Sequence, residues 1–384
     1  MKKYFIIAVA AVAAMAACSK VEANLDNANA PGQKITFQAA NYATATKAGE
    51  VSVLNDFDAF KCKAYLHAEG IDLNADGTVN GTSFQNFFGA NGETISVDDT
   101  SNPTEWAPTH TYYWPKGTKS FVNFIGWYGT DGTNAIDPTI TYAYDTDKYK
   151  ATMVWNFTSV AGEAGSNLLY ADMAWRFKSN EDPAKYGVSG ASEGVPMLFH
   201  HALAQINVKA YADGTVLTGA VEDANASWTI VLENPKITTV YNAGTLTLSN
   251  EDPGTKKTQA WTGSWAGSGE KGNIAASNLN VDKITKGTAN TLFNSTCVVP
   301  QTIGADVLLT FNMRITTTYK TDPANPNVEL IPVSIKLNDM GTTAWALNTK
   351  YTYYLKIVPS QNRVLFDPAL EADWSEVEGT EQTI

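Results

Sequence analysis

The chain has 384 residues and is acidic, because 39 Asp and Glu side chains outnumber 27 Lys and Arg and give a net charge of −12. An acidic surface repels the phosphate backbone, so nucleic acid is excluded as a partner. After residue 17 no apolar run is long enough to span a membrane, and the length suits two domains of ordinary size.

Residues 1–17 predict an export signal that ends at a lipidation site. Lys2 and Lys3 form a positive start, and residues 4–14 form an apolar segment too short to span a bilayer. Small residues then precede Cys18, as in a lipobox. We expect residues 1–17 to be a lipoprotein signal peptide and Cys18 to carry lipid. The alternative is an ordinary secretory signal followed by an incidental cysteine.

Residues 18–33 show no periodicity and are interpreted as a flexible tether. From residue 34 on, apolar and polar residues alternate with period two between turn-forming pairs such as Asp-Gly, which predicts short strands. Two short segments, Asn55–Phe60 and Asp172–Phe177, are expected to be helical. The clearest stripes of alternating residues are Ile35, Phe37 and Ala39; residues 121–128; Met153, Trp155 and Phe157; and residues 202–210, 307–315, 331–337 and 351–357.

Many short strands separated by turn clusters indicate an all-β fold made of β-sandwiches. A stretch rich in Gly and Ser around residue 190 sets the expected domain boundary. We predict an N-terminal β-sandwich over residues 34–195 and a C-terminal β-sandwich over residues 196–362.

Residues 363–384 are predicted to be an extended C-terminal tail added to the second sandwich. Pro359 and Pro368 would interrupt a regular strand ladder here. Apolar residues recur among acidic ones at Val364, Phe366, Leu370, Trp374 and Val377.

No catalytic motif is found, so we expect neither an enzyme nor a cofactor. The four His residues have no zinc-binding spacing, and His200 and His201 should point to opposite faces of a strand. A secreted hydrolase is the enzyme alternative, and it lacks a convergent acid–base pair.

Three further features each allow two interpretations. The run Asp72–Asp76 resembles the start of a calcium loop, but Ser83 stands where a bidentate Glu is needed, and an Asx-rich turn explains it equally well. Trp261 and Trp265 could stack on a sugar or anchor their loop. Two further residues, Cys62 and Cys297, could form a disulfide or stay as buried thiols.

Taken together, these segments resemble the fimbrillin family, the type V pilus subunits of Bacteroidales. The resemblance rests on the order of the lipobox and of several weak motifs along the mature chain. These motifs are ITFQAANYATATKAG, YYWPKGTKSFVNFIGWYG, NLLYADM, FHHALAQINVKAY, VVPQTI and WALNTKYTYYLKI.

The family implies two transthyretin-like, Greek-key β-sandwiches, export to the outer membrane through lipid on Cys18, and polymerisation with other pilus subunits. In the family a trypsin-like protease removes the first strand, and a strand from a neighbouring subunit replaces it. Carried over to this chain, the displaced strand is Lys34–Ala40, with Ile35, Phe37 and Ala39 on its apolar face. The donor is Val364–Val377.

The processing site would be the bond between Lys47 and Ala48. The family often has Arg before Ala, whereas the first Arg here is Arg176, so a Lys-cutting protease is required. The other interpretation of Lys47 is an ordinary solvated loop lysine. Alternative functions are a tip or accessory adhesin of the same pilus, or a surface lipoprotein that binds glycans. Host or bacterial surface ligands are candidate partners.

Overall fold

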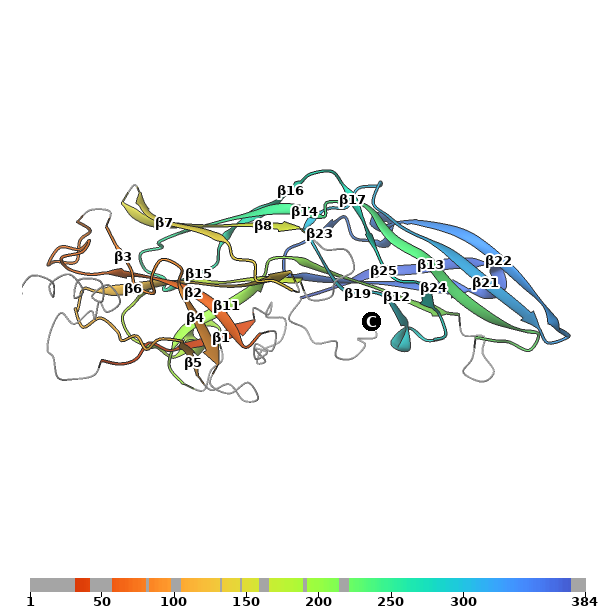
Figure 1. Ribbon diagram of the computed structural model, residues 1–384, viewed down its shortest axis with the longest axis horizontal. Coiled ribbons are helices and arrows are strands. Elements are labelled where there is room, and N and C mark those ends of the chain that lie inside the picture. The colour runs from red at the N-terminus through yellow and green to blue at the C-terminus, as the bar shows by residue number, and fades with distance from the viewer. Residues whose placement is uncertain are drawn as a thin grey trace, which may run out of the picture.

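The computed structural model describes residues 32–41, 57–80, 83–97, 105–131, 133–145, 147–158, 166–188, 192–213 and 221–373. Within these ranges the chain consists of β-strands with four short 3-10 helices and no α-helix, which confirms the all-β prediction. The molecule is elongated, with the early strands at one end and the late strands at the other (Figure 1). The 3-10 helices are η1 (Pro183–Tyr186), η2 (Lys286–Thr288), η3 (Leu337–Met340) and η4 (Pro359–Gln361).

The N-terminal part is a ten-stranded sheet in the order β15-β10-β6-β9-β11-β1-β5-β4-β2-β3. Because β2 also pairs with β6, the strands β6, β9, β11, β1, β5, β4 and β2 form a closed ring of main-chain pairings. The strands are β1 (Phe37–Asn41), β2 (Ala59–His67), β3 (Gln85–Asn86), β4 (Glu93–Val97), β5 (Trp106–Pro108), β6 (Phe121–Asp131), β9 (Ser166–Ala171), β10 (Met173–Phe177), β11 (Val195–His201) and β15 (Thr258–Gln259).

A second sheet, in the order β16-β14-β8-β7, joins strands from both halves of the sequence. The strands are β7 (Thr139–Asp145), β8 (Lys148–Thr158), β14 (Ala243–Glu251) and β16 (Thr262–Ser268). β8 and β14 run antiparallel from Lys150 opposite Glu251 to Thr158 opposite Ala243. The late strands therefore extend the early ones in one continuous sheet.

The C-terminal part consists of two sheets that pack face to face. One has the order β19-β12-β24-β25, from β12 (Ala204–Ala212), β19 (Asn290–Val298), β24 (Thr349–Val358) and β25 (Arg363–Asp373). The other has the order β17-β13-β21-β22, from β13 (Ala226–Val240), β17 (Gly272–Ala275), β21 (Leu308–Tyr319) and β22 (Asp322–Lys336), with β18 (Leu279–Asn280) also on β13. A short pair, β20 (Gln301–Thr302) and β23 (Ala344–Trp345), completes the fold.

Three apolar cores follow from this layering. One fills the ring and includes Phe37, Phe60 and Phe124. Another lies between the outer face of the ring and the second sheet, with Trp127, Trp155 and Leu246 among its members. The third lies between the two C-terminal sheets. β6 contributes to two cores because both of its faces are apolar, as its sequence predicted.

Two predictions about organisation need correction. A boundary between residues 195 and 196 would cut β11, which starts at Val195 and pairs with β1 and β9. The segment expected to be helical at Asp172–Phe177 contains strand β10, and Phe60 lies in β2. Met173–Phe177 is a short, mostly apolar run buried in a sheet, and such a run cannot be told from a buried helix by periodicity.

Candidate assembly site around the first strand

The predicted displaced strand lies inside the ring of pairings and not at an edge. β1 pairs in parallel with β11, from Phe37 opposite Val195 to Asn41 opposite Phe199, and Phe37 also lies opposite Trp106 of β5. Just before the strand, the Ile35 N–H donates to the carbonyl of Tyr112 at 2.9 Å. Loss of β1 would therefore open the ring and leave unpaired main-chain groups on β11 and β5.

The inward face of this segment carries the three residues expected from the sequence. Ile35, Phe37 and Ala39 are all buried in the core of the ring. The Phe37 ring makes edge-on contacts with three phenylalanines, at centroid distances of 6.1 Å to Phe60, 6.3 Å to Phe88 and 5.4 Å to Phe124. Phe37 is thus the main apolar anchor of the strand.

The opposite face of the segment is polar and is also covered. The Thr36 hydroxyl donates to the Glu193 carbonyl at 3.0 Å, and the Gln38 amide donates to Ser192 Oγ at 2.8 Å. The side-chain amide of Asn180 donates to the Lys34 carbonyl at 2.9 Å. These bonds fix the register of the strand between β11 and β5, because a shift by one residue would turn its polar face toward the core and its apolar face outward.

Gly194 allows the closest approach of the strand. A Cβ atom at this position would lie 2.9 Å from the Phe37 carbonyl carbon and 3.1 Å from its Cα. The role of Gly194 was not predicted, because this residue lies in the stretch interpreted as a domain boundary. Asn180 was not predicted either, and nothing in the local sequence marks either residue.

The predicted donor segment is described as far as Asp373. Residues 363–373 form β25, which pairs antiparallel with β24 at the edge of its sheet. Val364 packs against the C-terminal core, whereas the side chains of Phe366 and Leu370 are 41% and 52% exposed. The ladder shifts register around Pro368, where an edge strand tolerates the missing N–H. Trp374 and Val377 lie outside the described residues, as do Cys18, Lys47 and Ala48.

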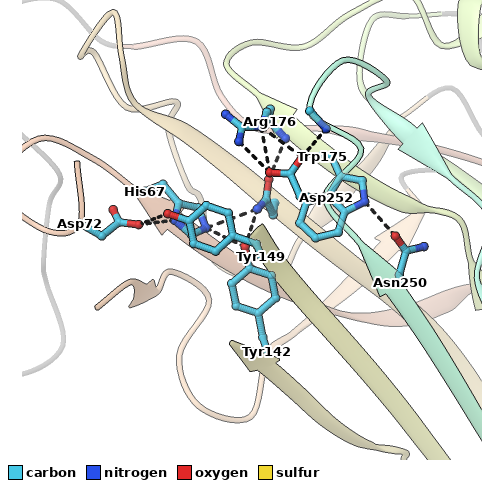
Figure 2. A network of polar contacts seen from close by, with 10 residues as sticks. His67, Asp72, Tyr142, Tyr149, Trp175, Arg176, Asn250 and Asp252 are labelled. Carbon is cyan, nitrogen blue, oxygen red and sulfur yellow. Dashed lines mark hydrogen bonds and ion pairs between the residues drawn. The ribbon is translucent and has the colours of Figure 1, made fainter. Parts of the chain in front are cut away.

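A buried polar network connects the ring to the second sheet (Figure 2). His67 Nδ1 lies 2.6 Å from Asp72 Oδ2, and its Nε2 lies 2.8 Å from the Tyr142 hydroxyl. The Tyr149 hydroxyl donates to the same Asp72 oxygen at 2.5 Å, while the Ala68 N–H donates to the other at 3.1 Å. Burial lowers the pKa of His67, so the imidazole is neutral and its Nδ1–H donates to the carboxyl group.

This network decides between the two interpretations of the Asp72–Asp76 run. Both Asp72 oxygens accept protein hydrogen bonds, and Asp72 is only 1% exposed. The Asp76 carboxyl group accepts from the hydroxyl and the N–H of Thr78, which lowers its pKa. The run is a structural anchor at Asp72 followed by an Asx-type turn at Asp76. Within the described ranges, no three His, Cys, Asp or Glu side chains are placed to hold a metal ion.

The two tryptophans proposed for sugar stacking are anchors. The Trp261 indole N–H donates to the Ala171 carbonyl at 2.9 Å, and that of Trp265 donates to the Ala202 carbonyl at 2.5 Å. Trp261 is buried and Trp265 is half-buried against the second core. They attach the strand β16 and its preceding turn to the N-terminal part.

The two adjacent histidines at the end of β11 are also held in place. His200 Nε2 lies 2.8 Å from Asp172, and its ring stacks on Tyr170. His201 Nδ1 lies 2.9 Å from Asn167, and burial lowers its pKa to about 3. They face different partners, as expected for neighbours on a strand.

The cysteines do not form a disulfide. Cys62 lies in the core of the ring and Cys297 in the core beside the second sheet, and both are free thiols. Burial raises the pKa of Cys62 well above its usual value and that of Cys297 to about 12. Both therefore act as small apolar core residues.

The described chain is thus an elongated, all-β protein whose first strand completes a closed ring. A family model described as fimbrillin-like matches residues 68–374, so the chain belongs to the fimbrillin-like family. This family implies a location at the cell surface. A search for helices long and apolar enough to cross a membrane found none in the parts of the chain described here.

Several solved structures match this chain over most of its length at low sequence identity. A fimbrial protein from Bacteroides vulgatus is 16% identical, with 89% of this chain and 100% of that chain covered and a TM-score of 0.48. A candidate cell adhesion protein from Bacteroides uniformis is 16% identical, with 89% and 99% covered and a TM-score of 0.41. One from Bacteroides ovatus is 12% identical, with 91% and 100% covered and a TM-score of 0.43. A comparison with curated proteins found no similar sequence.

Proposed function

We propose that this protein is a structural subunit of a cell-surface pilus that polymerises by protease-triggered strand exchange. Membership of the fimbrillin-like family supports a pilus-type adhesion subunit and a role without catalysis. The observation that carries the proposal is the seat of β1, where Phe37 fills the core of the ring between β11 and β5. A strand from another subunit with the same alternation of apolar side chains could take the place of β1 between β11 and β5.

Cleavage between Lys47 and Ala48 would convert this closed ring into an acceptor. β1 ends at Asn41, so a cut after Lys47 would leave it attached by non-covalent contacts alone. A free strand that dissociates would expose an apolar groove and two strand edges. Export as a lipoprotein, with Cys18 attached to outer-membrane lipid, would hold the subunit at the surface until cleavage.

The donor segment matches the strand that it would replace. Val364 and Phe366 repeat the spacing of Ile35 and Phe37, so Phe366 would enter the pocket that Phe37 vacates. β25 is an edge strand with Phe366 partly exposed, and its release from β24 would break the pairing from Thr349 to Val358 and uncover Val364, so exchange must replace these contacts in the neighbouring subunit. The exchange would bury Phe366 fully and would extend the chain of subunits head to tail.

Limited digestion of the purified mature chain with a Lys-specific protease tests the proposal. We expect cleavage after Lys47 to convert monomers into a ladder of polymers on unboiled gels. The Lys47→Gln variant should stay monomeric under the same conditions. A chain truncated after Asn362 should be cleaved but should not polymerise alone. Monomers that persist after clean cleavage at Lys47 would refute strand exchange.

A second candidate function is a tip or accessory adhesin of the same pilus. The pairing of β25 with β24 favours this candidate, because a terminal subunit needs no free donor strand. The truncated chain distinguishes the two. A tip subunit would join a polymer equally well with or without residues 363–384, whereas a stalk subunit without them would end the polymer.

A further inference from the structure

A basic pocket lies apart from the assembly site, where the turn after Asp252 meets β10 and the start of β6. Its volume is about 340 Å³, and five of its lining residues are cationic. We propose that this pocket binds a small anionic ligand, namely a sugar that carries one phosphate, sulfate or carboxylate group. The five cations are Lys119, Arg176, Lys178, Lys256 and Lys257.

Arg176 is held rigidly at the inner wall of the pocket. Its guanidinium forms an ion pair with Asp252, with Nη2 2.7 Å from Oδ2 (Figure 2). It also lies 4.9 Å from the centroid of the Phe121 ring. Its main-chain N–H donates to Asn123 Oδ1 at 2.7 Å. The Asp252 side chain is 3% exposed, whereas that of Arg176 is 39% exposed. The guanidinium is therefore fixed from behind and open on the side of the pocket.

The backbone of Arg176 supports a functional interpretation. Its φ angle is +57°, in the left-handed region that a long side chain rarely adopts. Such a conformation is strained and persists only where the surroundings enforce it. Here the hydrogen bond that the Arg176 N–H donates to Asn123 Oδ1 and the ion pair with Asp252 hold it. The result is a pre-positioned, planar donor suited to oxyanions.

The charges around the pocket do not cancel. Asp252 pairs with Arg176 and Glu181 pairs with Lys257, so three lysines and one further carboxyl group, that of Asp76, remain in the lining of the pocket. Lys178 donates to the carbonyl of Thr118 at 2.8 Å, a neutral partner that leaves its charge uncompensated. Lys119 and Lys256 are exposed at the rim. A positive patch on a chain of net charge −12 selects anions locally.

The size of the pocket limits the ligand class. Pockets for small molecules span about 300–1,000 Å³, so this one is at the lower end and accommodates a single sugar-sized group. The acidic chain as a whole repels extended polyanions. A monosaccharide with one charged substituent fits both limits. This inference does not depend on strand exchange, since the pocket and the seat of β1 share no residues.

Calorimetric titration of the intact mature chain tests the inference. The probes are glucose 6-phosphate, N-acetylglucosamine 6-sulfate and glucuronate, with neutral N-acetylglucosamine and inorganic phosphate as comparisons. We expect saturable binding of at least one anionic sugar, none of the neutral sugar, and weaker binding at higher salt. Tighter binding of glucose 6-phosphate than of inorganic phosphate would assign the pocket to a sugar, and equal binding would overturn that assignment.

The matched variants keep the folded structure intact. Because Lys119 and Lys256 are exposed, the double variant Lys119→Gln/Lys256→Gln should fold normally and weaken binding at least about tenfold. The control Lys236→Gln/Lys336→Gln changes the same net charge on the C-terminal sandwich and should bind as the unmodified chain does. Absence of binding for all anionic probes, or equal loss in both double variants, would overturn the proposal.

Discussion

Replacing Phe37 with Ala is expected to lower the free energy of unfolding by about 3–5 kcal/mol. The side chain is 0% exposed and contacts Phe60, Phe88 and Phe124 edge-on, so truncation leaves a cavity that these rings cannot easily fill. Urea denaturation followed by tryptophan fluorescence measures the loss.

The matched control for this prediction is Phe366→Ala in β25. Phe366 is 41% exposed on an edge strand, so its truncation should cost about 1 kcal/mol or less in the uncleaved monomer. Similar losses for the two variants would show that Phe37 is not the main anchor of the first strand.

Replacing Asp72 with Ala is expected to destabilise the protein by about 3–5 kcal/mol. Asp72 accepts hydrogen bonds from His67, Tyr149 and the Ala68 N–H in a fully buried setting. Its removal leaves these donors without a partner and without access to water. Thermal or urea unfolding of the variant checks the prediction.

The control for the second prediction lies in the same turn. Asp76 is exposed, and its carboxyl group accepts hydrogen bonds from the hydroxyl and the N–H of Thr78, two residues along the chain. Asp76→Ala should therefore leave the unfolding curve nearly unchanged. If it destabilises the chain as much as Asp72→Ala, the turn itself and not the buried network would be responsible.

Local patterns predicted much of the fold. The alternation of Ile35, Phe37 and Ala39 identified the buried face of the first strand, and the two apolar faces of β6 identified a strand between two cores. These predictions succeed because successive side chains of a strand point to opposite faces, whichever strands lie beside it.

Long-range pairings were not predictable in the same way. The continuous sheet formed by β8 and β14 joins residues about a hundred positions apart. Neither strand has a sequence feature that identifies the strand with which it pairs. The Asp72–Asp76 run has a turn pattern shared by calcium loops, and only the tertiary positions of His67 and Tyr149 show what Asp72 does. The basic pocket likewise assembles from four separate segments.

The most direct test of strand exchange is a disulfide between neighbouring subunits. If Phe366 takes the place of Phe37, Ala369 takes the place of Ala40, which lies directly opposite Leu198 in the pairing of β1 with β11. Because paired positions on neighbouring strands lie within disulfide range, we expect a chain with Leu198→Cys and Ala369→Cys to form intermolecular disulfides after cleavage at Lys47. The products should form a ladder that survives boiling without reductant, and each single variant should form none. Complete cleavage with no cross-linked species from the double variant would contradict the account.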